Sequence, residues 1–236
     1  MPRQPRTVFA GVPHHVTQRG NRRGQVFFTD ADRRVYLSWL RQYAAAAAVE
    51  VVAYCLMTNH VHLVVVPAVT HGLYQFLKPL NMRFAQRINR LREWKGHVWQ
   101  GRFHSSALDE TGLLMAVRYV ERNPVRAGLV SRAEEYFWSS AGAHCGFGRD
   151  PVLTSASRWH EALECVGDWS QWLAISDDSH SQEDLRRCTE QNLPCGSPVF
   201  IETLERDSGR PLRSRGPGRA RKGDASLFRE PGRDAD

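Results

Sequence analysis

The sequence predicts an α+β fold, a ferredoxin-like split βαβ sandwich with an antiparallel sheet. Three observations predict it. Short runs rich in β-branched and aromatic residues alternate with two long helical segments in the order strand, helix, strand, strand, helix, strand. Two of these strands follow each other after a tight connection, which indicates an antiparallel hairpin. Beyond about residue 150 the pattern changes to short, capped helices, so a C-terminal helical region follows the sheet domain.

The first half of the pattern contains a strand, a helix and a hairpin. HHVTQRG alternates as a strand does, and GNRRG then interrupts it. Asp30 is the expected N-cap of a helix over residues 31–48, in which five consecutive alanines favour helix. The apolar runs VEVVAYCL and HVHLVVVP are predicted strands, joined at Met57 to His60 and ended by Pro67.

The second half begins with another long helix over HGLYQFLKPLNMRFAQRINRLR, in which Pro79 is expected to cause a kink. GHVWQGRFHSSALD follows as a predicted strand. Thr111 is the expected cap of a third helix that ends at Asn123-Pro124, and Pro124 then takes the first position of a further helix.

The C-terminal region has two readings. Two short helices, SQEDLRRCTEQN and SPVFIETLERDSG, flank the turn LPCG, and Ser197-Pro198 is a good start for the second. The pair is either a DNA-reading helix-turn-helix or an ordinary helical hairpin. From Arg210 the chain is basic and rich in Gly and Pro, which predicts a disordered tail able to contact phosphates.

The composition indicates a polyanionic partner. The formal charge is +7 and the pI about 9.5, which favours nucleic acid or an anionic membrane. The five cysteines are odd in number and show no CxxC spacing, so we expect free thiols in a reducing cytosol. The N-terminus lacks an apolar signal and the apolar runs are short for a membrane span, so we expect a cytoplasmic protein without membrane association.

The segment TNHVHLVVVP carries the strongest chemical signal. On a strand, residues two apart point to the same face, so His60 and His62 can bind one divalent ion; alternatively, they are polar residues at a strand edge. Tyr119 and Asn123 lie one helical turn apart on the same face. The phenol can attack a phosphorus and the amide oxygen can be a third ligand, while the alternative for Tyr119 is core packing.

A surface for single-stranded nucleic acid requires cations for phosphates and aromatic faces for bases. Side chains of these two kinds cluster near the first strand, on the second helix and in WKGHVWQGRFH. The candidate DNA-binding residues are Gln18, Arg19, Asn21, Arg22, Arg23, Arg83, Arg87, Arg90, Trp99, Arg102 and Phe103. The alternatives are core packing for the two aromatic residues and solvated surface charge for the arginines. His14 and His15 are not assigned as metal ligands, because they lie on a different strand.

Three blocks, PHHVTQRGN, TNHVHLVVVP and RYVERNPVRAGLV, together resemble the REP-associated tyrosine transposases of the single-tyrosine HUH superfamily. The resemblance covers roughly Arg6 to Gly146 and includes the IS200-like insertion-sequence transposases. It implies that His60 and His62 hold Mg²⁺ or Mn²⁺ and that Tyr119 forms a 5′-phosphotyrosine link. Asn123 matches a position where relatives often place glutamine, and its side chain is one methylene shorter.

The resemblance also implies a function and a domain organisation. Residues 1–148 would form the HUH catalytic domain, residues 149–209 a helical region with a DNA-binding role, and residues 210–236 the basic tail. The implied activity is metal-dependent cleavage and joining of single-stranded DNA beside REP hairpins, in the cytoplasm at the nucleoid. We expect a monomer, although insertion-sequence relatives are dimers that exchange the tyrosine helix. The alternatives are a non-catalytic regulator that binds DNA hairpins and an RNA-processing nuclease.

Overall fold

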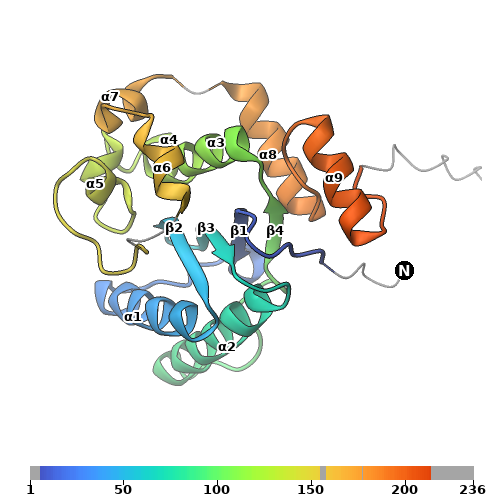
Figure 1. Ribbon diagram of the computed structural model, residues 1–236. Coiled ribbons are helices and arrows are strands. Elements are labelled where there is room, and N and C mark those ends of the chain that lie inside the picture. The colour runs from blue at the N-terminus through green and yellow to red at the C-terminus, as the bar shows by residue number, and fades with distance from the viewer. Residues whose placement is uncertain (1–5, 155–157, 177, 214–236) are drawn as a thin grey trace, which may run out of the picture.

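A four-stranded antiparallel sheet lies at the centre of the computed structural model, which describes residues 6–154, 158–176 and 178–213 (Figure 1). The strands are β1 (His14–Arg19), β2 (Val49–Leu56), β3 (His60–Pro67) and β4 (His104–Ala107). Their order in the sheet is β2-β3-β1-β4. Helix α1 (Asp30–Ala46) connects β1 to β2, and α2 (Gly72–Arg92) connects β3 to β4. This arrangement confirms the predicted ferredoxin-like fold.

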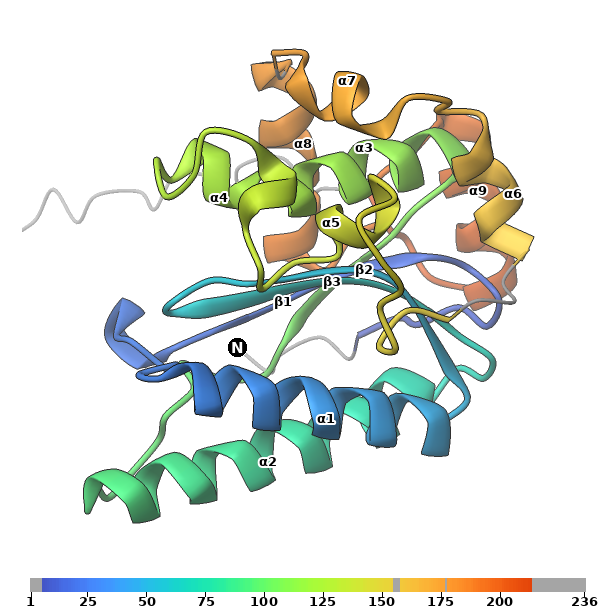
Figure 2. The same cartoon turned by 90° about the vertical axis from the view of Figure 1, so that its left-hand side faces the viewer.

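Helices cover both faces of the sheet (Figure 2). α1 and α2 lie on one face, and α3 (Glu110–Glu121) lies on the other. The helices described after α3 are α4 (Asn123–Arg126), α5 (Ala141–His144), α6 (Arg158–Glu164), α7 (Trp169–Ala174), α8 (Ser179–Gln191) and α9 (Pro198–Ser208). Two 3₁₀ turns occupy Asn21–Arg23 and Ala133–Glu135.

The alternation of β3 explains the two main cores. Val61, Leu63 and Val65 pack toward α1 and α2, whereas Val64 and Val66 belong to the cluster beneath α3. Because successive strand residues point to opposite faces, one continuous apolar run supplies both cores. The C-terminal helices complete the second core, since Leu163 (α6), Leu173 (α7) and Leu185 (α8) are buried in it. That core therefore draws on residues on both sides of the predicted boundary at residue 148.

Two helix starts differ from the sequence expectations because an earlier side chain already caps the helix. Thr29 rather than Asp30 caps α1: its hydroxyl accepts the N–H of Asp32, whose carboxylate accepts the N–H of Thr29. Asp109 rather than Thr111 caps α3, because its carboxylate accepts the Gly112 N–H at 2.8 Å. α2 continues through Pro79 as a single helix.

The predicted strand over residues 96–109 is reduced to β4. The preceding segment is held by Trp99, whose indole N–H donates to the Asn81 carbonyl at 2.9 Å from a buried position. Trp99 also forms an isolated bridge with Gly20. The residues around it therefore run as a loop against the end of β1 and cannot extend the β4 ladder.

The last described residues pack on the molecule. Leu212 is buried and its N–H donates to the Glu205 carboxylate at 2.8 Å, while Arg213 pairs with Glu202 at 2.8 Å. The tail predicted from residue 210 is therefore corrected for residues 210–213, because α9 supplies both an apolar contact and acidic partners. The rest of the predicted tail, residues 214–236, lies outside the described residues.

Two further sequence expectations concern thiols and membranes. All five cysteines are free, as expected from their number and spacing. In the part of the chain that the structure describes, no helix combines the length and the apolar character needed to cross a bilayer.

Candidate active site

The pairing of β1 with β3 gathers three histidines on one face of the sheet. The antiparallel register places His15 opposite Val64, Thr17 opposite His62 and Arg19 opposite His60. Directly opposed residues share a face, so His15, His60 and His62 all point toward the α3 side. The planes of the His15 and His62 rings are nearly parallel, with centroids 5.3 Å apart, and the centroid of the His60 ring lies 4.9 Å from that of His62.

Tyr119 lies against this histidine cluster. Its ring packs edge-on with the His62 ring at 5.5 Å and with the His15 ring at 5.6 Å, and only 6% of the residue is exposed. Arg126, seven residues later, places its guanidinium 4.2 Å from the centre of the phenol ring and donates to the Tyr119 carbonyl at 2.6 Å. Arg186 of α8 interacts with the Tyr119 phenol, and this interaction raises the pKa of the Arg186 guanidinium. The candidate nucleophile therefore has cations beside its ring and its hydroxyl.

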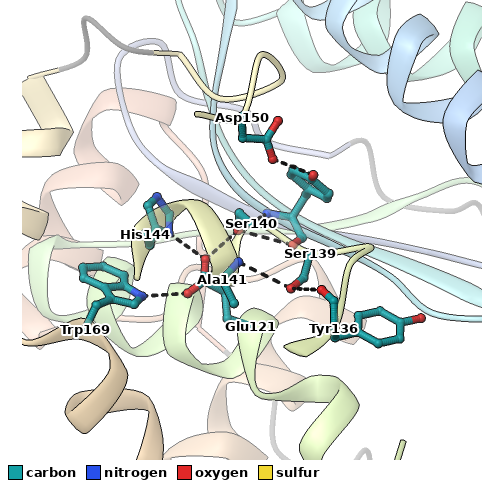
Figure 3. Close-up of polar contacts among 9 residues, drawn as sticks. Glu121, Tyr136, Ser139, Ser140, Ala141, His144, Asp150 and Trp169 are labelled. Atoms are coloured by element: carbon teal, nitrogen blue, oxygen red, sulfur yellow. Dashed lines mark hydrogen bonds and ion pairs between the residues drawn. The ribbon is translucent and has the colours of Figure 1, made fainter. Parts of the chain in front are cut away.

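Glu121 anchors the opposite side of α3 (Figure 3). Its fully buried carboxylate accepts hydrogen bonds from Ser140 at 2.5 Å, His144 at 2.6 Å and the Trp169 indole at 2.8 Å. Burial acts to lower the pKa of His144, but the charge and hydrogen bond of Glu121 outweigh it and raise that pKa. Residues two apart on a helix point in nearly opposite directions, so this network fixes the rotation that turns Tyr119 toward the histidines.

The site histidines are neutral at physiological pH. Burial, helped by the charge of Arg19, lowers the pKa of His60 to about 4. Burial and Arg126 lower the pKa of His15 to about 3, and burial with the neighbouring imidazoles lowers the pKa of His62 well below its usual value. A neutral imidazole retains one nitrogen lone pair, which is the form that binds a metal ion.

The hydrogen bonds of the ring nitrogens fit a divalent ion. Nδ1 of His60 lies 2.6 Å from the side-chain oxygen of Asn59, and Nδ1 of His62 lies 3.0 Å from His15. Nε2 of both rings lacks a hydrogen-bond partner among the described residues. No group of three His, Cys, Asp or Glu side chains there is arranged to hold an ion, so a third protein ligand would have to be of another kind. The Asn123 amide remains a prediction for this ligand; its nitrogen is buried without a hydrogen-bond partner among the described residues.

Comparison with known proteins gives a family for the segment that carries these residues. Residues 9–123, which include the histidines, Tyr119 and Asn123, match the family model described as "Transposase IS200 like". These residues belong to the IS200-like transposase family. A solved REP-associated tyrosine transposase bound to a REP hairpin aligns over 66% of this chain and 92% of its own, with a TM-score of 0.53 and 18% identity. That likeness shows a shared fold.

Two other comparisons add little. A solved protein from Deinococcus radiodurans, provisionally named a transposase, aligns over 54% of this chain and 92% of its own at 20% identity, with a TM-score of only 0.36. A search of curated protein sequences found no match.

A basic groove of about 500 Å³ begins beside the histidines of the transposase domain. Arg19, which pairs across the ladder with His60, lines it together with Arg102. The other arginines of the groove are Arg6, Arg210 and Arg213. Of these, Arg6 lies 4.1 Å from the Phe103 ring centre and Arg213 pairs with Glu202. Two of the predicted DNA-binding arginines, Arg19 and Arg102, thus line one groove. The other three arginines of the groove were not among the predicted DNA-binding residues.

The turn after β1 packs against the turn before β3. Gly20 donates to the Asn59 carbonyl at 2.8 Å, and the Asn59 amide donates to the Arg23 carbonyl at 2.8 Å. A Cβ on Gly20 would lie 2.2 Å from the Gly24 carbonyl oxygen, so this close approach requires glycine. Asn21, Arg22 and Arg23 are exposed on this turn, where Arg22 and Arg23 take positive φ angles of 53° and 60°.

Other predicted DNA-binding residues lie away from the histidines. Arg83, Arg87 and Arg90 belong to α2, which lies on the opposite face of the sheet (Figure 2). Trp99 and Phe103 are 8% and 7% exposed and belong to the core beneath α1 and α2. The two rings therefore pack in the core, which was the alternative to DNA binding. Because they are covered, they cannot stack on bases in this conformation.

Gln18 lines the basic groove, but its amide is already hydrogen-bonded within the protein. It is 5% exposed, and its amide is occupied by the Gly101 carbonyl at 3.0 Å and by Asn81 at 3.5 Å. Its position on β1 explains this. Gln18 points to the face opposite His15, which α1 and α2 cover, so its side chain is buried there.

Sequence reasoning missed several residues around Tyr119. Two had a signal: Arg126 follows Tyr119 by two helical turns, and Glu121 continues the apolar stripe Leu113, Val117 that defines the buried face of α3. Arg186 and Thr189, which reach the site from α8, had none, because nothing in their local pattern reveals a partner so distant in the chain.

Proposed function

We propose that this protein is a metal-dependent single-stranded DNA endonuclease and strand transferase that acts beside REP-type hairpins through Tyr119. The observation that carries the proposal is the packing of the Tyr119 ring against His62, at 5.5 Å, within a single chain. A phenol, two neutral imidazoles and nearby arginines are the groups that a tyrosine-dependent phosphoryl transfer requires. Membership of the IS200-like family over residues 9–123 supports the same activity.

The reaction conserves the phosphodiester energy. The Tyr119 oxygen attacks the scissile phosphorus, a tyrosine–phosphate bond forms at the 5′ end, and the bond to the 3′ oxygen breaks. The phenolic proton leaves and the departing 3′ oxygen gains a proton, which gives a 3′-OH. The Arg186 guanidinium, whose pKa is raised by its interaction with the phenol, would stabilise the negative charge on that oxygen. Reversal by a 3′-OH rejoins DNA without ATP.

Mg²⁺ or Mn²⁺ would be held by His60 and His62, with Asn123 as the proposed third protein ligand. When bound, the ion would neutralise charge on the scissile phosphate and polarise its oxygens. The residues of this chain supply the rest: Asn59 and His15 hold the two imidazoles through their Nδ1 atoms, and Arg126 and Arg186 hold the nucleophile.

The substrate proposal rests on charge and on the structural relative. The basic groove begins at Arg19 beside His60 and provides a path for a phosphate backbone. The solved relative is bound to a REP hairpin, and we extend that class of ligand to this chain. Among the residues predicted from the sequence, we propose Arg19, Arg102 and the exposed turn Asn21–Arg23 as the DNA contacts. We also propose that the protein acts at the nucleoid.

The test uses the full chain, Mg²⁺ and a labelled single strand that carries a REP-type hairpin. The wild type should form a covalent protein–DNA adduct, and Tyr119→Phe should abolish it, because only the attacking oxygen is lost. Tyr74→Phe is the matched control, since Tyr74 is 55% exposed on α2. Normal cleavage by Tyr119→Phe would identify an activated water as the nucleophile and overturn the proposal.

The same assay separates the alternatives. Hairpin affinity that persists in EDTA, with no cleavage in any divalent metal, would support the non-catalytic regulator. Efficient cleavage of an all-RNA hairpin strand, with the matching DNA left intact, would support the RNA nuclease. The proposal requires cleavage of DNA and loss of the adduct in His62→Ala.

A further inference from the structure

Helix α8 reaches the histidine cluster from outside the segment that matches the transposase family. The Thr189 hydroxyl lies 2.8 Å from Nδ1 of His15 and 2.7 Å from the carbonyl oxygen of Leu185. Nε2 of His15 lies 3.0 Å from Nδ1 of His62. Thr189, His15 and His62 are 1%, 1% and 4% exposed, so these contacts form a buried chain of hydrogen bonds that ends at a proposed metal ligand.

The carbonyl at the start of the chain fixes the direction of every bond. A carbonyl oxygen can only accept, so the single Thr189 hydroxyl proton is donated to Leu185, a common bond for threonine in a helix. The Thr189 oxygen must then accept the Nδ1 proton of His15. Because His15 is buried and neutral, its Nε2 carries no proton and accepts from Nδ1 of His62.

The consequence falls on the far nitrogen of His62. With its proton on Nδ1, the ring has a lone pair on Nε2 and can bind a cation there. If the chain ran in the other direction, His15 would donate to Nδ1 of His62, and the proton of His62 would occupy Nε2. His15 by itself permits both directions, so Thr189 is the group that decides between them.

His60 obtains the same tautomer by a separate route. The Asn59 amide nitrogen donates to the Arg23 carbonyl at 2.8 Å, which turns the Asn59 oxygen toward Nδ1 of His60 at 2.6 Å. Nδ1 of His60 therefore carries its proton and Nε2 is left with a lone pair. The two hydrogen-bond chains come from different parts of the sequence and prepare the same nitrogen on both rings.

We propose that Thr189 and His15 are positioning residues that fix the Nδ1-protonated tautomer of His62 and so prepare its Nε2 to bind the divalent ion. The inference rests on the proposed function. It assigns a role in the site to α8, which lies beyond residues 9–123, and to a histidine that is not itself a metal ligand.

The first test measures Mn²⁺ binding to the full chain without DNA, by the EPR signal of free Mn²⁺. Thr189→Val removes the hydroxyl at similar volume and should weaken binding about tenfold or more, the usual effect of losing a group that orients a metal ligand. Thr189→Ser retains the hydroxyl and should bind as the wild type does. Thr203→Val is the matched control, because the Thr203 hydroxyl bonds the Val199 carbonyl at 3.0 Å on the exposed part of α9.

The second test reads the tautomer directly from the ¹⁵N shifts of the His62 ring. In the metal-free wild type, Nδ1 should be the protonated nitrogen, and in Thr189→Val a protonated Nε2 should gain population. Wild-type Mn²⁺ affinity and an unchanged His62 tautomer in Thr189→Val would overturn the inference. Weak binding by Thr189→Ser as well would also overturn it, because the hydroxyl would then not be the deciding group.

The two proposals fail in different ways. If Mn²⁺ still binds to both His60→Ala and His62→Ala, the proposed metal site is wrong, and the proposed function is overturned with it. Loss of binding in those two variants, with no change in Thr189→Val, would leave the proposed function in place and remove only the role of Thr189 and His15.

Discussion

His14 and His15 are neighbours in the chain, yet strand alternation sends them to opposite faces of the sheet. His14 holds the segment before β1: its Nδ1 lies 2.8 Å from the Val12 carbonyl and its Nε2 accepts the Phe9 N–H at 3.3 Å. Both nitrogens are thus used within the N-terminal segment. His15 instead contacts His62 and Thr189. The role of each histidine follows from its face and its partners.

His14 predicts a pH dependence of stability. Burial lowers the pKa of His14 to about 4, although its bond to Val12 acts to raise it. In the unfolded chain this histidine takes up a proton near pH 6.5, whereas the folded chain resists it until about 4. The unfolded state therefore binds more protons in this window, and the stabilisation is complete above pH 6.5 and is lost as the pH falls toward 4. Within this window, the protonation of His14 should lower the free energy of unfolding by about 1.4 kcal/mol for each pH unit of decrease.

Urea unfolding between pH 7 and pH 4 measures this slope. His14→Gln should show a slope that is lower by that amount, whatever its stability at pH 7. His97→Gln replaces an exposed histidine and is the control. Equal slopes in the wild type and His14→Gln would show that His14 titrates alike in both states.

The sequence was informative about residues whose partners are local. His60 and His62 are two residues apart on one strand, and Tyr119 stands in a recognisable block, so local pattern was enough to name the candidate metal ligands and nucleophile. The contacts of His15 join residues 47 and 174 positions away. No periodicity records such pairs, because they depend on strand register and on how α8 packs beside β4.

At the scale of an element, the position of α3 depends on its two sides. Tyr119 faces the histidines. Glu121 faces α5 and α7 (Figure 3), so its carboxylate network anchors the helix that carries the proposed nucleophile. The carboxylate has three donors and no exposure, which means that its charge is paired only inside the fold. If the charge of Glu121 is removed, the His144 imidazole loses the partner that raises its pKa.

We expect Glu121→Gln to destabilise the fold by about 3 kcal/mol, the range measured when one partner of a buried ion pair is removed. The amide keeps the volume but loses the charge and turns a donor toward other donors. Glu183→Gln, at an exposed position on α8, should change the free energy of unfolding by less than about 0.5 kcal/mol. Equal effects of the two substitutions in urea unfolding would rule out the anchor.

Element order was easier to predict than element ends. The two long helices, the hairpin and the antiparallel sheet follow from hydrophobic periodicity, which extends over many residues. The N-caps at Thr29 and Asp109 and the shortness of β4 depend on single hydrogen bonds and on one buried indole. Several residue types can make such contacts, so the pattern could not select among them.

At the scale of the whole molecule, the C-terminal region completes the transposase domain. Cys195 donates its N–H to the Ala107 carbonyl at 2.8 Å, Ser106 donates to the Leu193 carbonyl at 2.7 Å, and α8 supplies Leu185 to the core beneath α3. The edge strand β4 is therefore covered by the chain after α8, which limits unwanted strand pairing. The division at residue 148 remains a sequence prediction, but these contacts favour folding of the two regions together.

The same architecture predicts that one chain holds a complete site. Only residues 108 and 109 separate β4 from α3, and Leu108 is fully buried with its N–H bonded to the Pro13 carbonyl at 2.8 Å. So short and buried a link opposes exchange of the tyrosine helix between chains, which requires a hinge. We therefore expect a monomer in which Tyr119 acts with His62 of its own chain.

Mixing two inactive variants tests this expectation. A mixture of Tyr119→Phe and His62→Ala should stay inactive on the labelled hairpin strand, because every site lacks either the nucleophile or a metal ligand. Sedimentation should give the mass of a single chain. With exchanged helices, some sites in the mixture would combine an intact Tyr119 with an intact His62, and the covalent adduct would return on the His62→Ala chain alone. A size-tagged His62→Ala chain makes that outcome visible on a denaturing gel, and its appearance would show that the site is shared between two chains.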